Sequence, residues 1–149
     1  MYPVILSIHN IIRWVALVLG ILAAVRGYVG WFGNREWTVK DRKIGSYFTI
    51  AMDVQLLLGL LLYIFLSPAT RTALQDFSAA MQVGDLRFIA LEHPFYMILA
   101  VILAHLGTIL SRKAEQSNAK FRRAAIWFSL SVLAIILGIP WMSRLFPGF

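Results

Sequence analysis

The chain has 149 residues, of which 60% are apolar, with a mean hydropathy of +0.74 and a formal net charge of +7. This composition excludes an ordinary soluble protein, because charge-poor runs long enough to cross about 30 Å of hydrocarbon recur along the chain. The sequence has no cysteine, which excludes disulfides, thiolate catalysis, cysteine-ligated iron–sulfur clusters and thioether-attached haem.

Four membrane-spanning helices are predicted, in chain order over residues 4–25, 46–66, 88–111 and 124–142. Each is near the length of about 20 residues that a transmembrane helix needs, and none has the alternation of barrel strands. Arg13 interrupts the first apolar run and no basic residue precedes it, so we interpret this run as a span rather than a signal peptide. The sequence predicts an all-α integral membrane four-helix bundle forming one domain over residues 1–149.

Basic residues gather between spans one and two and between spans three and four. They are Arg26, Arg35, Lys40, Arg42 and Lys43 in the first group and Arg112, Lys113, Lys120, Arg122 and Arg123 in the second. The positive-inside rule places both groups in the cytoplasm, with both termini and residues 67–87 outside, where only Arg71, Arg87 and Arg144 are basic. We expect a multi-pass protein of the bacterial cytoplasmic membrane, whose basic residues contact anionic lipid rather than nucleic acid.

The outer connection contains a segment with helical spacing of its apolar residues, which are Leu74, Phe77, Ala80 and Met81. This spacing predicts a helix over residues 70–82 that lies on the outer membrane surface, with a solvated loop as the alternative.

Polar residues within the spans indicate where function should be sought, because each costs a few kcal/mol in lipid unless it is paired or faces a cavity. They are His9, Asn10, Arg13, Asp53, Gln55, Glu92, His93 and His105. His9 and Arg13 share one face of the first helix, and Glu92 and His93 have about the same depth as His9 in the third span. We expect these helix ends to meet, with the third helix kinked at Pro94 or beginning near it.

Two inward histidines at matched depth suit the axial ligation of one haem b, with His9 and His93 as the iron ligands. Arg13 would offset the propionates or pair with Glu92, and Tyr96 and Trp14 would line the ring. Three alternatives stay open: interfacial histidines beside a buried Arg13–Glu92 ion pair, a metal ion, or a quinone headgroup held by the same groups.

A second polar layer of Asp53, Gln55 and His105 is predicted nearer the cytoplasm. His105 follows His93 by twelve residues, about 18 Å along a helix, so the two cannot share one small site. Asp53 and His105 are expected to form a structural hydrogen bond, with a proton-relay pair as the alternative. His105 could also ligate a second haem, but three histidines cannot supply two bis-histidine haems.

The segments LSIHNIIRW, RGYVGWFGNREWTVKDRKIG, QLLLGLLLY, RFIALEHPFYMILA and ILGIPW resemble small four-helix bacterial membrane proteins labelled cytochrome b-like. The resemblance covers nearly the whole chain. It implies a haem-bearing or haem-derived bundle, with His9 and His93 as the histidines of its IHN and EHP patterns. Some members have a histidine where this chain has Asp53, so the resemblance favours the outer site over a deeper haem.

The leading hypothesis is a b-type cytochrome that transfers electrons between a quinone and an outer-side partner. The alternative is a haem-free accessory subunit of a larger respiratory or photosynthetic complex, or a homo-oligomer, packed through Gly20, Ala23, Ala24 and Gly27. A transporter or proton channel is least favoured, because no repeat or broken-helix pair is visible. No catalytic constellation is recognisable, which favours electron transfer over a stand-alone enzyme.

Overall fold

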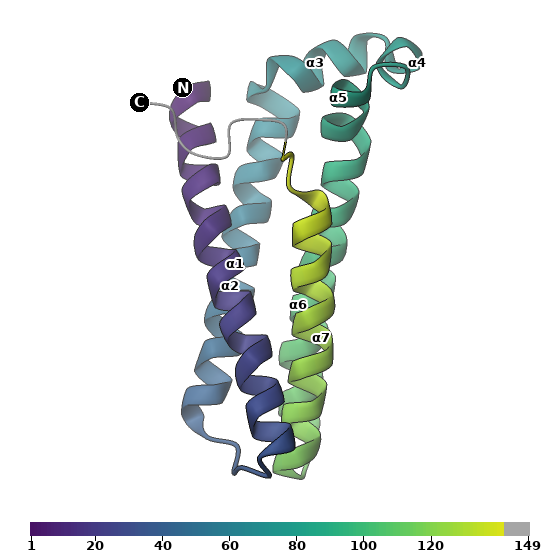
Figure 1. Ribbon diagram of the computed structural model, residues 1–149. Helices are drawn as coiled ribbons and strands as arrows, with labels where there is room; N and C mark the ends of the chain where they lie inside the picture. Colours follow the sequence, from purple (N-terminus) through teal and green to yellow (C-terminus); the bar gives the residue numbers. More distant parts are fainter. Residues whose placement is uncertain (142–149) are drawn as a thin grey trace.

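The computed structural model describes residues 1–141, which form helices and contain no strand. Two of the four long helices are α1 (Tyr2–Phe32) and α2 (Val39–Leu61), the latter continued by the π-helical turn η1 (Leu62–Leu66). The third consists of α5 (Gly84–Arg87), the π-helical turn η2 (Phe88–Glu92) and α6 (His93–Lys113), and the fourth is α7 (Ser117–Gly138). All four are long and apolar enough to cross a membrane, which confirms the predicted all-α class with four candidate spans. Figure 1 shows them side by side along one axis.

The helices extend beyond the predicted spans at the end that carries the two short connections. α1 continues past Arg26 to Phe32, and the Arg26 guanidinium lies 2.6 Å from the Asp41 carboxylate of α2. Asp41 also belongs to a capping box, in which the Thr38 hydroxyl accepts from the Asp41 backbone N–H and the Asp41 carboxylate accepts from the Thr38 N–H. At the opposite end α7 finishes at Gly138, and Met142 lies outside the described residues.

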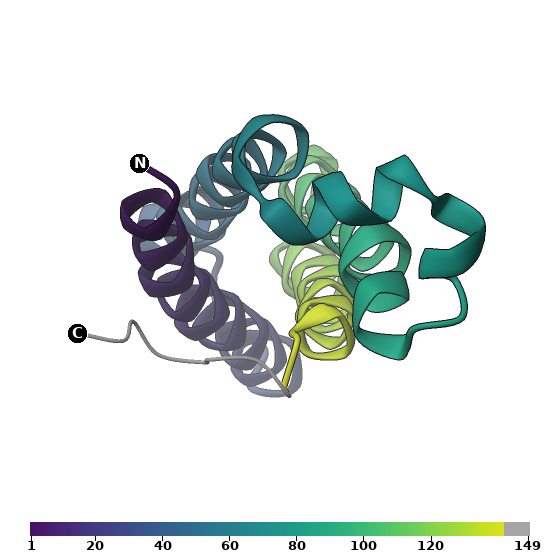
Figure 2. The same cartoon turned by 90° about the horizontal axis from the view of Figure 1, so that it is seen from above.

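The connection between α2 and α6 folds into short helices over one end of the bundle (Figures 1 and 2). The segment predicted as one helix over 70–82 is divided into α3 (Pro68–Gln75) and α4 (Phe77–Ala80). The division falls at Asp76, whose backbone leaves the helical region at φ −140° and ψ 86°. Its carboxylate accepts from the Ala79 N–H at 2.9 Å and so caps α4.

Small residues allow α1 to approach its neighbours closely inside the bundle. A Cβ atom at Gly27 would lie 2.6 Å from the backbone nitrogen of Ala125 on α7, and one at Gly20 would lie 2.8 Å from Phe48. Ala23 and Ala24 are buried in the same core. The small-residue stripe that could have served a partner subunit is therefore used within this chain.

Three polar links set the antiparallel register of α2 and α6. Arg112 donates to the Ser46 hydroxyl at 2.7 Å, and the hydroxyls of Thr49 and Thr108 are 2.7 Å apart. The third link joins Asp53 to His105. Because the two helices are antiparallel, residues later in α2 pair with residues earlier in α6, and all three pairs keep the same alignment of the two helices.

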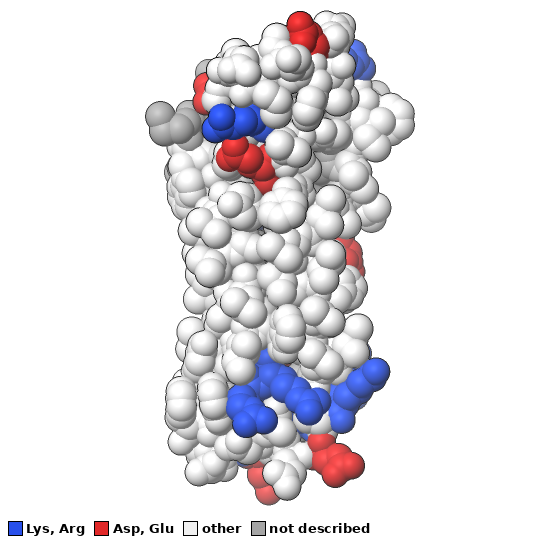
Figure 3. Space-filling view, turned by 90° about the vertical axis from the view of Figure 1, so that its right-hand side faces the viewer, with Lys and Arg blue, Asp and Glu red and all other residues white. Residues whose placement is uncertain are grey.

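Charged side chains gather at the two ends of the molecule and leave a largely uncharged band between them (Figure 3). This distribution agrees with helices that cross the hydrocarbon region between two headgroup regions.

Candidate functional site

A cavity of about 410 Å³ lies among the helix ends that carry α3, at the same end as the start of α1 and the end of α7. Residues of α1, α2, η1, α3, η2 and α6 line it, among them Tyr2, His9, Asn10, Arg13, Gly59, Tyr63, Thr70 and His93. Its volume falls within the range of about 300–1,000 Å³ that is typical of small-molecule and cofactor sites.

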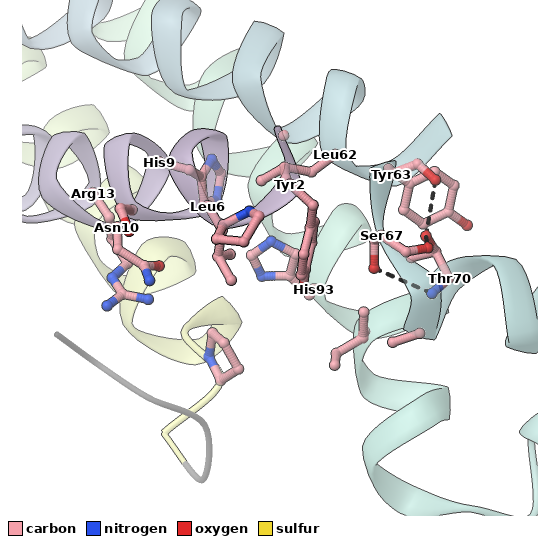
Figure 4. Close-up of a pocket in the computed structure, with 16 residues that line it drawn as sticks. Tyr2, Leu6, His9, Asn10, Arg13, Leu62, Tyr63, Ser67, Thr70 and His93 are labelled. Atoms are coloured by element: carbon pink, nitrogen blue, oxygen red, sulfur yellow. Dashed lines mark hydrogen bonds between the residues drawn. The ribbon is translucent and has the colours of Figure 1, made fainter. Parts of the chain in front are cut away.

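His9 and His93 meet at this cavity from opposite helices, α1 and α6 (Figure 4). Their ring centroids are 6.4 Å apart and their planes are inclined by 71°. Two imidazoles on opposite sides of one metal ion have ring centres about 6.3 Å apart, because each nitrogen lies about 2.0 Å from the metal. The observed separation is close to this value, and it also lies within the range of two rings in direct edge contact.

Each of the two histidines has one ring nitrogen engaged by the protein. In His93, Nδ1–H donates to the backbone carbonyl of Gly138 at 2.7 Å, which leaves Nε2 as the nitrogen with a lone pair. This is the arrangement that commonly orients a metal-ligating histidine through its second nitrogen.

In His9 the engaged nitrogen is Nε2, which lies 3.2 Å from the amide nitrogen of Gln55. His9 Nδ1 and Gln55 Oε1 are buried and have no hydrogen-bond partner among residues 1–141. Turning the Gln55 amide by 180° would let Oε1 accept the Nε2–H of His9 and would leave Nδ1 with its lone pair. A ligand at Nδ1 would then satisfy an atom that is costly to leave unpaired.

Arg13 adds a buried cation to the cavity wall, one helical turn beyond His9 on α1. The residue is only 6% exposed, and its guanidinium carbon lies 5.4 Å from the centre of the Trp14 ring. Asn10 is also buried and lines the cavity beside Arg13 (Figure 4). The cavity thus combines two imidazoles, a cation and an amide with a mainly apolar wall, which suits a large apolar ligand that carries acidic groups.

Two π-helical turns border the cavity, η1 on the α2 side and η2 on the α6 side. Such turns are rare and occur often at functional sites. η2 ends at Glu92, two residues before Pro94, which lacks the N–H that would bond one turn back, so the wider turn accommodates the missing bond. The third span is therefore continuous through Pro94, and its regular α-helix begins at His93.

Three of the predicted site residues are not among the residues that line the cavity. Glu92 pairs with Arg87 at 2.8 Å on the surface, five residues away, as the spacing of a π-turn allows. Tyr96 packs against Gly138 and Phe95. Trp14 packs against the bundle core. The predicted Arg13–Glu92 pairing is consequently not formed.

The three residues of the predicted second polar layer do not form one group in the structure. His105 Nε2–H donates to Asp53 Oδ1 at 2.8 Å, which is the hydrogen bond that the sequence favours. Gln55 does not join that pair but faces His9. No group of three or more His, Asp or Glu side chains in residues 1–141 is arranged to hold a metal ion by itself.

Sequence reasoning missed the Gly138 carbonyl, Tyr63 and Thr70. Tyr63 donates to the Ala90 carbonyl at 2.8 Å, and Thr70 donates to the Tyr63 carbonyl at 2.9 Å, so both fix the backbone around the cavity. The one sequence signal in this segment is Pro68, because proline is common at the first position of a helix. It predicts a helix start that includes Thr70, but not the contact of Thr70 with the cavity.

No family model, curated protein or solved structure matches this chain.

Proposed function

We propose that this protein is a b-type cytochrome of the bacterial cytoplasmic membrane, holding one haem between His9 and His93. The observation that carries the proposal is the 6.4 Å separation of the two imidazole rings, both of which line one cavity. The bond from His93 Nδ1–H to the Gly138 carbonyl adds to it, because it leaves Nε2 of that ring with a lone pair for a metal.

Haem would supply one-electron redox chemistry when bound, and the chain would set its potential through ligation and burial. His9 and His93 would hold the iron. Arg13 would face the acidic propionates, where its charge would offset theirs. We further propose electron exchange between a membrane quinone and a partner on the outer side, since the cavity lies at the end opposite the basic loops.

The proposed orientation places both termini outside and the two short loops in the cytoplasm. It rests on the basic side chains at the α1–α2 and α6–α7 ends, among them Arg42, Lys43, Arg112 and Arg123.

The test is a dithionite-reduced minus oxidised absorption spectrum of the purified protein, produced with ample haem supply. Wild type is expected to show a sharp α-band, and His9→Ala and His93→Ala are each expected to lose it. His105→Ala is the matched control, because this third histidine bonds Asp53 outside the cavity, and it should retain the band.

A colourless wild-type protein would contradict the proposal and favour the haem-free accessory subunit. Loss of the band in His105→Ala at unchanged helix content would also contradict it, because it would assign ligation to a residue outside the cavity.

A further inference from the structure

The hydrogen-bonded side chains of Asp53 and His105 are exposed on the outside of the bundle, although they lie well within two candidate spans. Each side chain is 45% exposed. His105 precedes Arg112 by seven residues and Asp53 follows Arg42 by eleven, so the pair lies about 10–16 Å inside the basic end of the bundle. In a membrane this depth belongs to hydrocarbon, where an uncovered polar pair is costly.

The surface around the pair is apolar. Ile50 and Leu57 flank Asp53 on its face of α2, and Ile102 and Ile109 flank His105 on α6; all four are exposed. Such side chains are expected wherever a helix faces lipid, so they do not distinguish this face. The polar pair does distinguish it, because lipid tails cannot satisfy its remaining hydrogen-bonding atoms.

The pair has a donor and an acceptor left over. The bond between His105 Nε2 and Asp53 Oδ1 is the one hydrogen bond that the structure of residues 1–141 gives either side chain. Because a net charge is costly in hydrocarbon, the pair is favoured as a whole without charge, and one donor and one acceptor then remain, at His105 Nδ1 and Asp53 Oδ2. These atoms are complementary to those of an identical pair.

We propose that the α2–α6 face is the contact surface of a homodimer, in which the Asp53–His105 pairs of two copies cover each other. A second copy inserted with the same topology carries its pair at the same depth, and a twofold axis along the membrane normal brings like faces together. His105 Nδ1 of each copy then shares a hydrogen bond with Asp53 Oδ2 of the other. The two pairs together carry no net charge, and no polar group of either pair faces lipid.

The absence of cysteine from the chain makes a direct test possible. Ile102→Cys places one thiol beside the pair, one helical turn from His105. Val18→Cys is the control, because Val18 is 62% exposed on α1, a helix outside this face. After treatment of native membranes with a membrane-permeant bismaleimide, Ile102→Cys is expected to run as a cross-linked dimer on a denaturing gel, and Val18→Cys as a monomer.

The role of the pair is tested in the Ile102→Cys background. Asp53→Leu, which has no polar side-chain atom, is expected to lower the cross-linked fraction about tenfold, from the loss of two bonds of the strength usual between transmembrane helices. The exchange variant Asp53→His with His105→Asp keeps the pair and should restore cross-linking.

Equal cross-linking at positions 102 and 18 would overturn the proposal, since it would indicate random encounters. Undiminished cross-linking in Asp53→Leu would overturn the role of the pair, and helix content by circular dichroism excludes a folding failure as the cause of any loss. The proposal does not depend on haem, because the cross-link is scored whether or not the protein is coloured.

Discussion

The role of Gln55 in the proposed site comes from its hydrogen bond to His9. Gln55 is buried on α2, faces His9, and is not a ligand candidate itself. Its amide fixes which nitrogen of His9 carries the proton, and this assignment decides whether that ring can bind a metal.

Replacing Gln55 with leucine, which has a similar size but no polar atoms, should therefore loosen the proposed haem without unfolding the bundle. Loss of a hydrogen-bonding partner behind a metal ligand usually costs about 10–100-fold in affinity. We expect the haem dissociation rate, measured by transfer to apomyoglobin, to rise about tenfold or more in Gln55→Leu.

Gln82→Leu is the control for that experiment, because Gln82 is exposed and does not line the cavity. Equal dissociation rates in wild type and Gln55→Leu would show that the amide does not orient the ligand.

The meeting of His9 with His93 was predictable, whereas the environments of Gln55 and Glu92 were not. Residue spacing gives the depth of a side chain in a span, and matched depth was enough to bring the two histidines together. The direction of a side chain around the helix axis depends on which neighbour packs on which face. The wide turn of η2 changes that direction for Glu92, which reaches Arg87 instead of the cavity.

At the scale of the helices, hydropathy predicted all four long elements, but the π-turns left no sequence signal apart from Pro94. Apolar length is a property of a whole segment and survives local irregularity. A π-turn depends on a single extra residue that the surrounding packing must hold in place, so its position follows from the fold.

Gly27 gives the sharpest test of helix packing. A methyl group there would lie 2.6 Å from a backbone nitrogen of α7, and backbone atoms cannot turn aside as a flexible side chain can. Gly27→Ala should force α1 and α7 apart and lower the free energy of unfolding by about 1–3 kcal/mol, measured by denaturation in detergent.

Gly84→Ala is the matched control for this change, since nothing lies within 4 Å of a Cβ atom at that position. It should leave stability unchanged or raise it slightly, because alanine favours a helix more than glycine does. Equal effects of the two substitutions would contradict the close approach of α1 and α7.

At the scale of the whole molecule, the two ends are chemically different. One carries the cavity and the short helices α3, α4 and α5, and the other carries two short loops and most of the basic side chains (Figures 1 and 3). This asymmetry is what the positive-inside rule uses to orient a membrane protein.

Single cysteines in this cysteine-free chain can report that orientation. With a membrane-impermeant maleimide added to intact spheroplasts, Gln82→Cys near α4 should be labelled, and Glu36→Cys in the α1–α2 loop should be labelled only after the cells are opened. Both residues are exposed, so access to the reagent differs only by side of the membrane. The reverse pattern would place the cavity on the cytoplasmic side and contradict the proposed outer partner.

The bond from His93 to Gly138 also bears on biogenesis. His9, Gln55 and His93 belong to the first three long helices to leave the ribosome, whereas Gly138 is the last residue of the fourth. Both histidines and the amide behind His9 are therefore synthesised before the carbonyl that fixes His93. The cavity stays incomplete on that side until α7 inserts, and this interval is when a bulky cofactor has its widest entrance.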